Sequence, residues 1–386
     1  MNAVPGRAVI CIVLAACTSG ADPAVRDPWT WRDLPEPTPV SLSTAGTLKV
    51  TPLGTFGSDT GSAMLGVISA VAATDKELFV FDRSTCEVVV FARSTRSVTR
   101  RFGRCGRGPT DMEFATSMAV SNDTLVLTDR AEEWMALWST SGQPLGTNQL
   151  SLADSAWLNA FYISSIDSGR YGISVDLLSN RGTPNGRQFR GQGAAHFRIV
   201  DRSGRQIQPG LFVDGQGPER QTEALHRGLA TCASVDRKEK PYVTSINGWV
   251  SQLATVSLEN EERPVRFNHV YRDSPIRPKP KANSNGTFVK GGMSAIVCDR
   301  DRVIASMLID SSSTIGERQV TWLMVELEDF ETFTAKGTVR DTEWFGAPSA
   351  IRGNSAFVVQ NHVADYPRVF EVRIETGAHN EMRVRP

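Results

Sequence analysis

Short runs of β-forming residues alternate with polar turns along the chain from about Leu48 onward, and no long stretch shows the 3.6-residue periodicity of a helix. Connectors such as Asn122-Asp123 and Ser141-Gly142 are short enough to close β-hairpins. The runs gather in groups of four, and each group predicts an antiparallel meander of four strands. The groups cover Leu65–Phe102, Ser117–Leu150, Phe161–Phe212, Ala230–Phe267, Ser294–Thr334 and Ser349–Arg385.

Several of these runs are apolar on consecutive residues, as in Leu78–Phe81 and Leu323–Val325, so both faces of those strands must be covered. Stacked propeller blades cover both faces, whereas a two-sheet sandwich would show a cleaner alternation. The pattern therefore predicts an all-β fold, a six-bladed β-propeller of four-stranded antiparallel meanders. Each group averages about 56 residues, above the usual 40–50 of a blade, and the excess falls in polar insertions at Leu178–Ala194 and Asn268–Gly291.

The first residues are predicted to form an export signal and are excluded from the fold. Arg7 precedes an apolar run, Ala8–Ala16, that is far shorter than the roughly 20 residues of a membrane-spanning helix. The sequence Leu14-Ala15-Ala16-Cys17 resembles the lipobox of bacterial lipoproteins, which implies cleavage before Cys17 and a lipid on its thiol. No Asp follows the cysteine, which in the lipoprotein sorting pattern implies the outer membrane of a diderm cell. The alternative is an ordinary signal peptide with an incidental cysteine.

The segment that follows is rich in proline, which favours extended chain over helix. The predicted organisation is thus a lipoprotein signal peptide at residues 1–16, a tether at 17–45 and the propeller at 46–386. The body would be anchored to a membrane through lipid only.

A glycine-rich junction follows the first predicted meander. It contains Gly103, Gly106, Gly108, Pro109 and Phe114, and its glycines can take the positive φ of a chain crossing between blades. It resembles the inter-blade signature of bacterial six-bladed propeller lipoproteins related to NHL repeats, with Phe114 wedged between sheets. A phosphate cradle would have to open a helix, and no helical pattern follows.

Two weaker copies of this junction occur elsewhere. One contains Gly215, Gly217 and Pro218 but lacks the phenylalanine, and the other is Leu53–Gly57. The copy at Leu53 lies before the first meander, so we expect Lys49–Thr55 to add an outer strand to the last blade and close the ring. The C-terminal Glu381–Arg385 would then compete for that place or pair beside it.

Candidate chemistry is sparse. The resemblance to propellers includes lactonases and lyases that hold calcium or zinc in the central channel, but the five histidines show no paired metal-ligand spacing. His226 and His362 are the first to examine. Asp82, Asp129 and Asp176 end the second strands, where an aspartate usually accepts backbone N–H groups. No catalytic residue and no metal ligand is assigned.

Four cysteines remain in the body once Cys11 leaves with the signal and Cys17 carries lipid, which permits two disulfides in an exported protein. Cys86 and Cys105 belong to one blade and its exit loop and form the favoured pair. The other two, Cys232 and Cys298, occupy equivalent places in the first strands of consecutive blades.

Charge and aromatic residues add two further expectations. The chain of 386 residues has 42 basic and 42 acidic side chains, which removes the case for a nucleic-acid partner. A cluster of arginines in the first meander suits strand edges, with an anionic ligand site as the alternative, and three tryptophans suit packing between blades, with sugar binding as the alternative. These residues are Arg93, Arg96, Arg100, Arg101, Arg104, Arg107, Trp134, Trp138 and Trp157.

The sequence therefore favours a monomeric, membrane-anchored lipoprotein whose propeller binds a protein or a small ligand in the cell envelope, without catalysis and without a cofactor. The alternative is a lactonase- or lyase-like propeller enzyme with calcium or zinc in its channel. A purely structural envelope component is a third reading.

Overall fold

The structure is a computed structural model, and it describes the strands and most of the turns between them. The described residues are 38–41, 47–106, 108, 111–129, 134–150, 158–177, 195–213, 229–247, 252–258, 265–270, 281–283, 286–288, 292–310, 318–329, 332–341, 346–361, 366–376 and 382–384.

Within these residues the chain forms four sheets of four strands, two sheets of five strands and one two-stranded hairpin. The first two sheets are β3 (Ile68–Ala73), β4 (Glu77–Asp82), β5 (Glu87–Ala92) and β6 (Val98–Phe102), then β7 (Ala115–Ser121), β8 (Thr124–Asp129), β9 (Trp134–Ser139) and β10 (Pro144–Gln149). The next two contain β11 (Leu158–Ser165), β12 (Arg170–Leu177), β13 (Ala195–Asp201) and β14 (Gln206–Val213), then β15 (Leu229–Val235), β16 (Pro241–Asn247), β17 (Gln252–Ser257), β18 (Val265–Val270) and β1 (Thr38–Ser41).

Two further large sheets follow. They contain β21 (Gly292–Asp299), β22 (Arg302–Asp310), β23 (Arg318–Asp329), β24 (Thr332–Asp341) and β28 (Met382–Val384), then β25 (Pro348–Arg352), β26 (Ser355–Gln360), β27 (Arg368–Thr376) and β2 (Leu48–Phe56). The hairpin is β19 (Lys281–Asn283) and β20 (Gly286–Phe288), and the short 3-10 helix η1 covers Gly61–Ala63.

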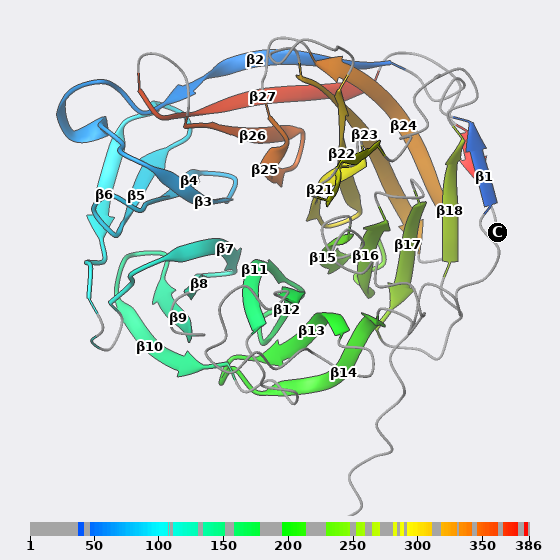
Figure 1. The fold of residues 1–386 in the computed structure, drawn as a ribbon. Helices are drawn as coiled ribbons and strands as arrows, with labels where there is room; N and C mark the ends of the chain where they lie inside the picture. Colours follow the sequence, from blue (N-terminus) through cyan, green and yellow to red (C-terminus); the bar gives the residue numbers. More distant parts are fainter. Residues whose placement is uncertain are drawn as a thin grey trace, which may run out of the picture.

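Sequence neighbours pair antiparallel within each large sheet, and the sheets stand around a common axis (Figure 1). The first strands face that axis and contact one another in cyclic order: β3, β7, β11, β15, β21, β25 and again β3. The prediction of an all-β propeller built from four-stranded antiparallel sheets is confirmed.

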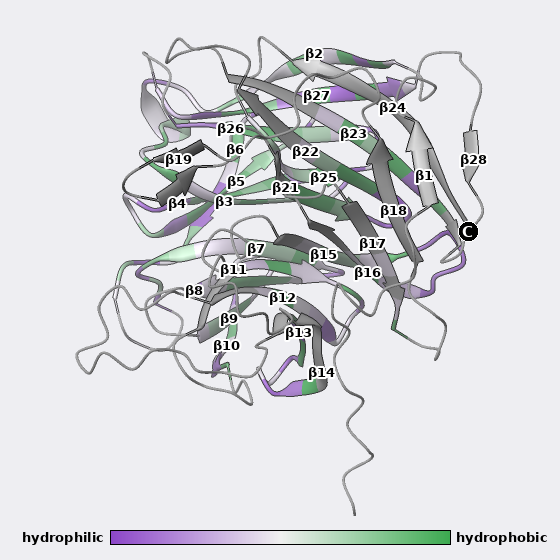
Figure 2. Cartoon of the chain, turned by 45° about the vertical axis from the view of Figure 1, so that its right-hand side comes forward, coloured by the Kyte–Doolittle hydropathy of each residue, from purple (hydrophilic) through white to green (hydrophobic). Residues whose placement is uncertain are grey.

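The core lies between neighbouring sheets, and hydrophobic residues concentrate inside them (Figure 2). Leu78, Phe79, Val80 and Phe81 are all fully buried, as their consecutive apolar pattern predicts. Phe79 and Phe81 pack toward the second sheet, while Leu78 and Val80 pack toward Phe357 of the last. A strand with both faces covered this way cannot tolerate the polar alternation of a half-exposed strand.

The last sheet is built from both halves of the sequence. β2 pairs antiparallel with β27, from Leu48 opposite Thr376 to Phe56 opposite Val369. Phe56 is fully buried, and its ring lies 5.7 Å from that of Phe91 in an edge-to-face arrangement. The N-terminal strand therefore joins the last sheet to the first through apolar packing.

Both chain ends differ from the predicted organisation. Thr38–Ser41, inside the segment interpreted as a tether, forms β1 and pairs in parallel with β18. Met382–Val384, within the segment expected beside the N-terminal strand, instead pairs with β24 of the preceding sheet. The reason is that the nine residues of β2 occupy the outer position on β27, so the short C-terminal strand must pair with another open edge.

The predicted strand limits fail most in the fifth sheet and in the insertions. The fourth strand of that sheet, expected at Thr332–Thr334, is β24 and extends to Asp341. The insertion at Asn268–Gly291 contains the end of β18 and the hairpin β19–β20. The insertion at Leu178–Ala194 lies outside the described residues.

Candidate functional site: the central channel

The first strands enclose a cavity of about 450 Å³ on the propeller axis. This volume lies in the lower half of the range of small-molecule sites, about 300–1,000 Å³. The cavity is therefore the strongest candidate site in the described part of the chain. Its wall is formed by Ser69–Ala73, Thr116–Val120, Tyr162–Ser165, Thr231–Ser234, Ala295–Asp299 and Ala347–Arg352.

A one-residue β-bulge recurs in the first strands. The pairing register shifts by one residue near the start of β3, β7, β11, β21 and β25. A bulge interrupts the ladder and re-aims the side chain of the extra residue, and bulges are frequent beside functional sites. All of these lie at the end of the channel where the first strands begin. The extra residues are Ser69, Thr116, Phe161, Ser294 and Ser349.

Three of these bulge residues, Ser69, Thr116 and Ser349, line the cavity. The sequence analysis missed them because a bulge depends on pairing register, which no local pattern encodes. One sequence signal that could have pointed to these positions is the serine or threonine that recurs in or just before the first strand of several predicted meanders.

Hydroxyl groups also join neighbouring first strands. The Ser69 hydroxyl donates to the carbonyl of Ala115 at 2.6 Å, and the backbone N–H of Ile163 donates to Ser117 Oγ at 2.9 Å. Ser174 on β12 donates in the same way to the carbonyl of Thr231, at 2.9 Å. These bonds hold the strands at fixed spacing, so the polar wall is preorganised.

Tyr162 is the largest side chain in the wall whose surface remains open. It directly follows a bulge residue, and 51% of its surface is exposed although it lines the cavity. Partial desolvation raises the pKa of its phenol above its ordinary value. Tyr162 therefore adds an exposed aromatic residue to the lining of the cavity.

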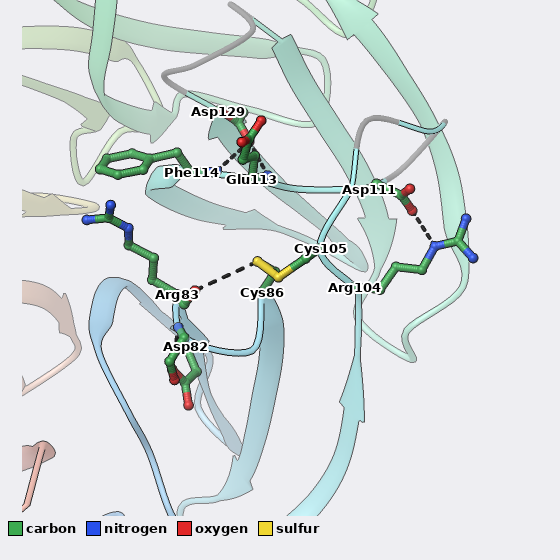
Figure 3. Close-up of a disulfide and its surroundings, with 10 residues drawn as sticks. Asp82, Arg83, Cys86, Arg104, Cys105, Asp111, Glu113, Phe114 and Asp129 are labelled. Carbon is green, nitrogen blue, oxygen red and sulfur yellow. Dashed lines mark hydrogen bonds and ion pairs between the residues drawn. A yellow bond between two sulfur atoms is a disulfide. The ribbon is translucent and has the colours of Figure 1, made fainter.

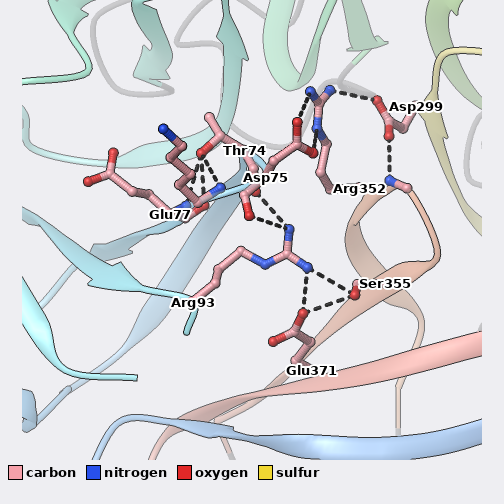
Figure 4. Close-up of polar contacts among 10 residues, drawn as sticks. Thr74, Asp75, Glu77, Arg93, Asp299, Arg352, Ser355 and Glu371 are labelled. Atoms are coloured by element: carbon pink, nitrogen blue, oxygen red, sulfur yellow. Dashed lines mark hydrogen bonds and ion pairs between the residues drawn. The ribbon is translucent and has the colours of Figure 1, made fainter. Parts of the chain in front are cut away.

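Among the described residues that line the cavity, the charged ones are Asp299 and Arg352, at the end opposite the bulges. Arg352 Nη1 lies 3.2 Å from Asp299 Oδ1, and its Nε lies 2.9 Å from Asp75 Oδ1 (Figure 4). The hydrogen bond to Asp75 raises the pKa of Arg352, and the same bond lowers the pKa of Asp75. In the described wall the guanidinium of Arg352 thus pairs with the carboxylate of Asp299, while Asp75, which lies outside the wall, adds a second negative charge to this cluster.

The described part of the glycine-rich junction forms a loop around Asp111. Gly103 has a φ of 99°, and a Cβ there would lie 2.9 Å from the carbonyl oxygen of Cys86. The N–H of Gly108 donates to Asp111 Oδ2 at 3.0 Å, and Arg104 pairs with the same carboxylate (Figure 3). Because an aspartate already occupies this loop, it offers no phosphate cradle.

Phe114 contacts residues of both of the first two sheets. Its ring carries the guanidinium of Arg83, 3.4 Å from the ring centroid, and its backbone N–H donates to Asp129 at 2.8 Å (Figure 3). Gly106 has a φ of 152° and packs against Asp111. Pro109 and the second copy of the motif, Gly215, Gly217 and Pro218, lie outside the described residues.

Asp82 acts in the turn in the way the sequence suggested. Its carboxylate accepts the N–H groups of Gly66 and Val67, at 2.9 and 3.1 Å, and the N–H and hydroxyl of Ser84. Burial alone would raise the pKa of Asp82, but these donors outweigh it and hold the pKa below its ordinary value. Asp129 likewise accepts the N–H of Glu113. The side chain of Asp176 lies outside the described residues.

The four described cysteines form two disulfides. Cys86 and Cys105, the favoured pair, are joined with their Cα atoms 4.9 Å apart (Figure 3). Cys232 and Cys298 are joined across β15 and β21, with Cα atoms 5.9 Å apart, and both line the cavity. Cys17 lies outside the described residues.

The arginines of the first sheet have partners, so they do not form an open anion site. Arg93 pairs with Glu371 at 2.5 Å (Figure 4), and Arg100 pairs with Glu77 at 2.6 Å. Arg101 pairs with Glu87, and Arg96 donates to the carbonyl of Leu53. Arg93 and Arg96 therefore connect the first sheet with the last, whereas Arg100 and Arg101 pair with glutamates of their own sheet. Arg107 lies outside the described residues.

The tryptophans are consistent with packing between sheets. Trp138 is buried, and its ring lies 5.1 Å from that of Phe102 in the first sheet. Trp134 is half-buried, and Trp157 lies outside the described residues.

In the part of the chain that the structure describes, no group of three or more His, Cys, Asp or Glu side chains is placed to hold a metal ion. His226 and His362 lie outside that part. Among the same described residues, no helix has the length and apolarity required to cross a bilayer.

Comparison with known proteins supports the fold alone. No family model and no curated protein matches the chain. A member of the DUF4221 family from Bacteroides vulgatus matches with a TM-score of 0.55 at 10% identity, over 86% of this chain and 98% of that one. A protein of Bacteroides fragilis described as exported matches with a TM-score of 0.52 at 10% identity, over 88% of this chain and 100% of that one. The chain is thus similar in fold to these two bacterial proteins.

Proposed function

We propose that this protein is an exported lipoprotein whose propeller binds a small ligand in its central channel without catalysing a reaction. The channel carries the proposal: it is a ligand-sized cavity with a preorganised wall of hydroxyl and apolar groups. We count each of the large sheets as one blade, which makes six, and take the β2–β27 pairing as the closure of the ring. A protein partner at the channel mouth is the other form of this binding role.

The site can be tested by filling the channel. Ser349→Trp puts a large ring at an exposed position in the cavity wall, whereas Ser141→Trp puts one on an exposed hairpin away from it. Thermal-shift and calorimetric titrations would use sets of neutral sugars, amino acids, organic acids and nucleosides. We expect at least one set to bind the wild type and the Ser141→Trp variant but not the Ser349→Trp variant. Binding that survives in the Ser349→Trp variant, or no binding by any set, would refute the proposal.

The proposed anchor is a separate question with its own experiment. We propose that Cys17 carries the lipid and holds the body at the outer membrane, with the chain before β1 as tether. Metabolic labelling with a palmitate analogue should mark the wild type and fail to mark Cys17→Ser. Fractionation of the envelope should then place the wild type with outer-membrane markers. Equal labelling of both forms would remove the lipoprotein assignment.

The rival is a lactonase- or lyase-like hydrolase with calcium or zinc in the channel. Elemental analysis of protein purified without chelators separates the two proposals, because stoichiometric metal would favour the enzyme. We further propose that the protein is monomeric, does not bind nucleic acid and needs no cofactor. Light scattering during gel filtration and gel-shift assays test the first two.

A further inference from the structure

We propose that the channel ligand is a neutral carbohydrate, bound with a sugar face against Tyr162 and its hydroxyls on the bulge side chains. This inference rests on the proposed function and narrows it to one class of ligand. The observations that carry it are the electrical neutrality of the wall, the ring of bulges at one mouth and the open aromatic ring of Tyr162.

The neutrality of the described cavity wall excludes more classes of ligand than the other two observations do. Among the described residues of the cavity wall, the charged side chains are Asp299 and Arg352, which pair with each other at 3.2 Å. Arg352 is held further by Asp75. An ionic ligand moved from water into this lumen would lose hydration without gaining a free counter-charge, which is unfavourable. An uncharged ligand avoids that loss.

The polar groups suit a ligand with many hydroxyls. The bulges add Ser69, Thr116 and Ser349 to the wall at the mouth where the first strands begin. Ser69 already donates its proton to Ala115, and its oxygen still has lone pairs that can accept. Hydroxyl groups both donate and accept, as sugar hydroxyls do, so pairs can form in either direction.

The aromatic residue supplies the apolar side of the same recognition. Tyr162 follows the bulge of β11, lines the cavity and exposes 51% of its surface. A pyranose ring has an apolar face of C–H groups, and burial of that face against an aromatic ring is favourable while the ring edge remains hydrogen-bonded. The remaining wall is largely Ala, Val and Ile, which excludes water without adding charge.

Calorimetric titration of the full purified protein tests the inference. The neutral probes are maltose, cellobiose and lactose, and the charged probes are glucuronate and glucosamine. We expect a neutral disaccharide to bind at least about tenfold more tightly than either charged sugar, since only the charged ones lose uncompensated hydration. Tyr162→Ala should weaken this binding by about tenfold, and Tyr162→Phe by less than about threefold.

Tyr366→Ala serves as the matched control, since Tyr366 is a half-buried tyrosine outside the cavity wall. It should leave disaccharide binding unchanged, and thermal unfolding of all variants checks that they fold. Tighter binding of a charged sugar, or equal weakening by Tyr162→Ala and Tyr366→Ala, would overturn the inference. If no sugar binds but an amino acid or nucleoside binds and Ser349→Trp blocks it, the carbohydrate assignment fails while the proposed channel function stands.

Discussion

The substitution Phe56→Ala tests whether β2 is required to hold the ring together. Phe56 is fully buried on β2 and packs against Phe91 and Phe357, at 5.7 and 6.4 Å between ring centroids. A buried aromatic side chain hides about 150–250 Å², which at about 25 cal/mol per Å² is about 4–6 kcal/mol. Measured losses for Phe→Ala in cores are about 3–5 kcal/mol, so we expect about 4 kcal/mol. At about 2 °C per kcal/mol, the midpoint of thermal unfolding should fall by about 8 °C.

Hydrogen exchange distinguishes a loosened ring from a generally weaker core. In Phe56→Ala the amides of β2 and β27 should lose protection before those of β8, because β2 is released locally. Phe81→Ala is the matched control, since Phe81 is equally buried but belongs to β4. It should lower stability by a similar amount while β2 keeps its protection relative to the other strands. A loss below about 1 kcal/mol for Phe56→Ala, or identical exchange patterns in the two variants, would refute the reasoning.

Three further predictions concern polar and covalent contacts. Glu371→Gln leaves the half-buried guanidinium of Arg93 without its charged partner, and it should lower the free energy of unfolding in urea by about 2–3 kcal/mol. The double variant Arg93→Met/Glu371→Gln should recover this loss, and no recovery would argue against the pair. The pKa of Asp82 is lowered in the folded state, so its contribution to the free energy of unfolding is present above the unfolded pKa of about 4 and is lost as pH falls through the folded pKa. Asp82→Asn should therefore flatten the plot of unfolding free energy against pH in this range. An unchanged slope of that plot would contradict this. The Cys86–Cys105 disulfide joins cysteines 19 residues apart, so the double variant Cys86→Ser/Cys105→Ser should lose about 3 kcal/mol of the free energy of unfolding. Free thiols at both positions in the unreduced wild type would exclude the disulfide.

The strands could be predicted from sequence because the local pattern of apolar residues indicates which strands are buried. Leu78–Phe81 is apolar at every position, and such a run requires cover on both faces whatever the surrounding chain does. The turn role of Asp82 was also predictable, since an aspartate at a strand end usually pairs with nearby backbone N–H groups.

Edge pairing could not be predicted in the same way. β1 and β28 are short strands that add to sheets far from them in sequence, and their choice depends on which edges other segments leave open. The candidate site was missed for a related reason. The bulges at Ser69 and Ser349 arise from pairing register, and the exposure of Tyr162 depends on the shape of the assembled channel.

The last sheet combines strands from the two ends of the chain, and this limits the order in which the protein can fold. Leu48 on β2 is synthesised early, yet its partner Thr376 on β27 follows about 330 residues later, a very long-range contact for any folding chain. Until β27 arrives, β2 has an unsatisfied backbone edge that other chains could join. We therefore expect assembly to finish with the capture of β2, and nascent or truncated chains that lack β27 to be the species most prone to self-association.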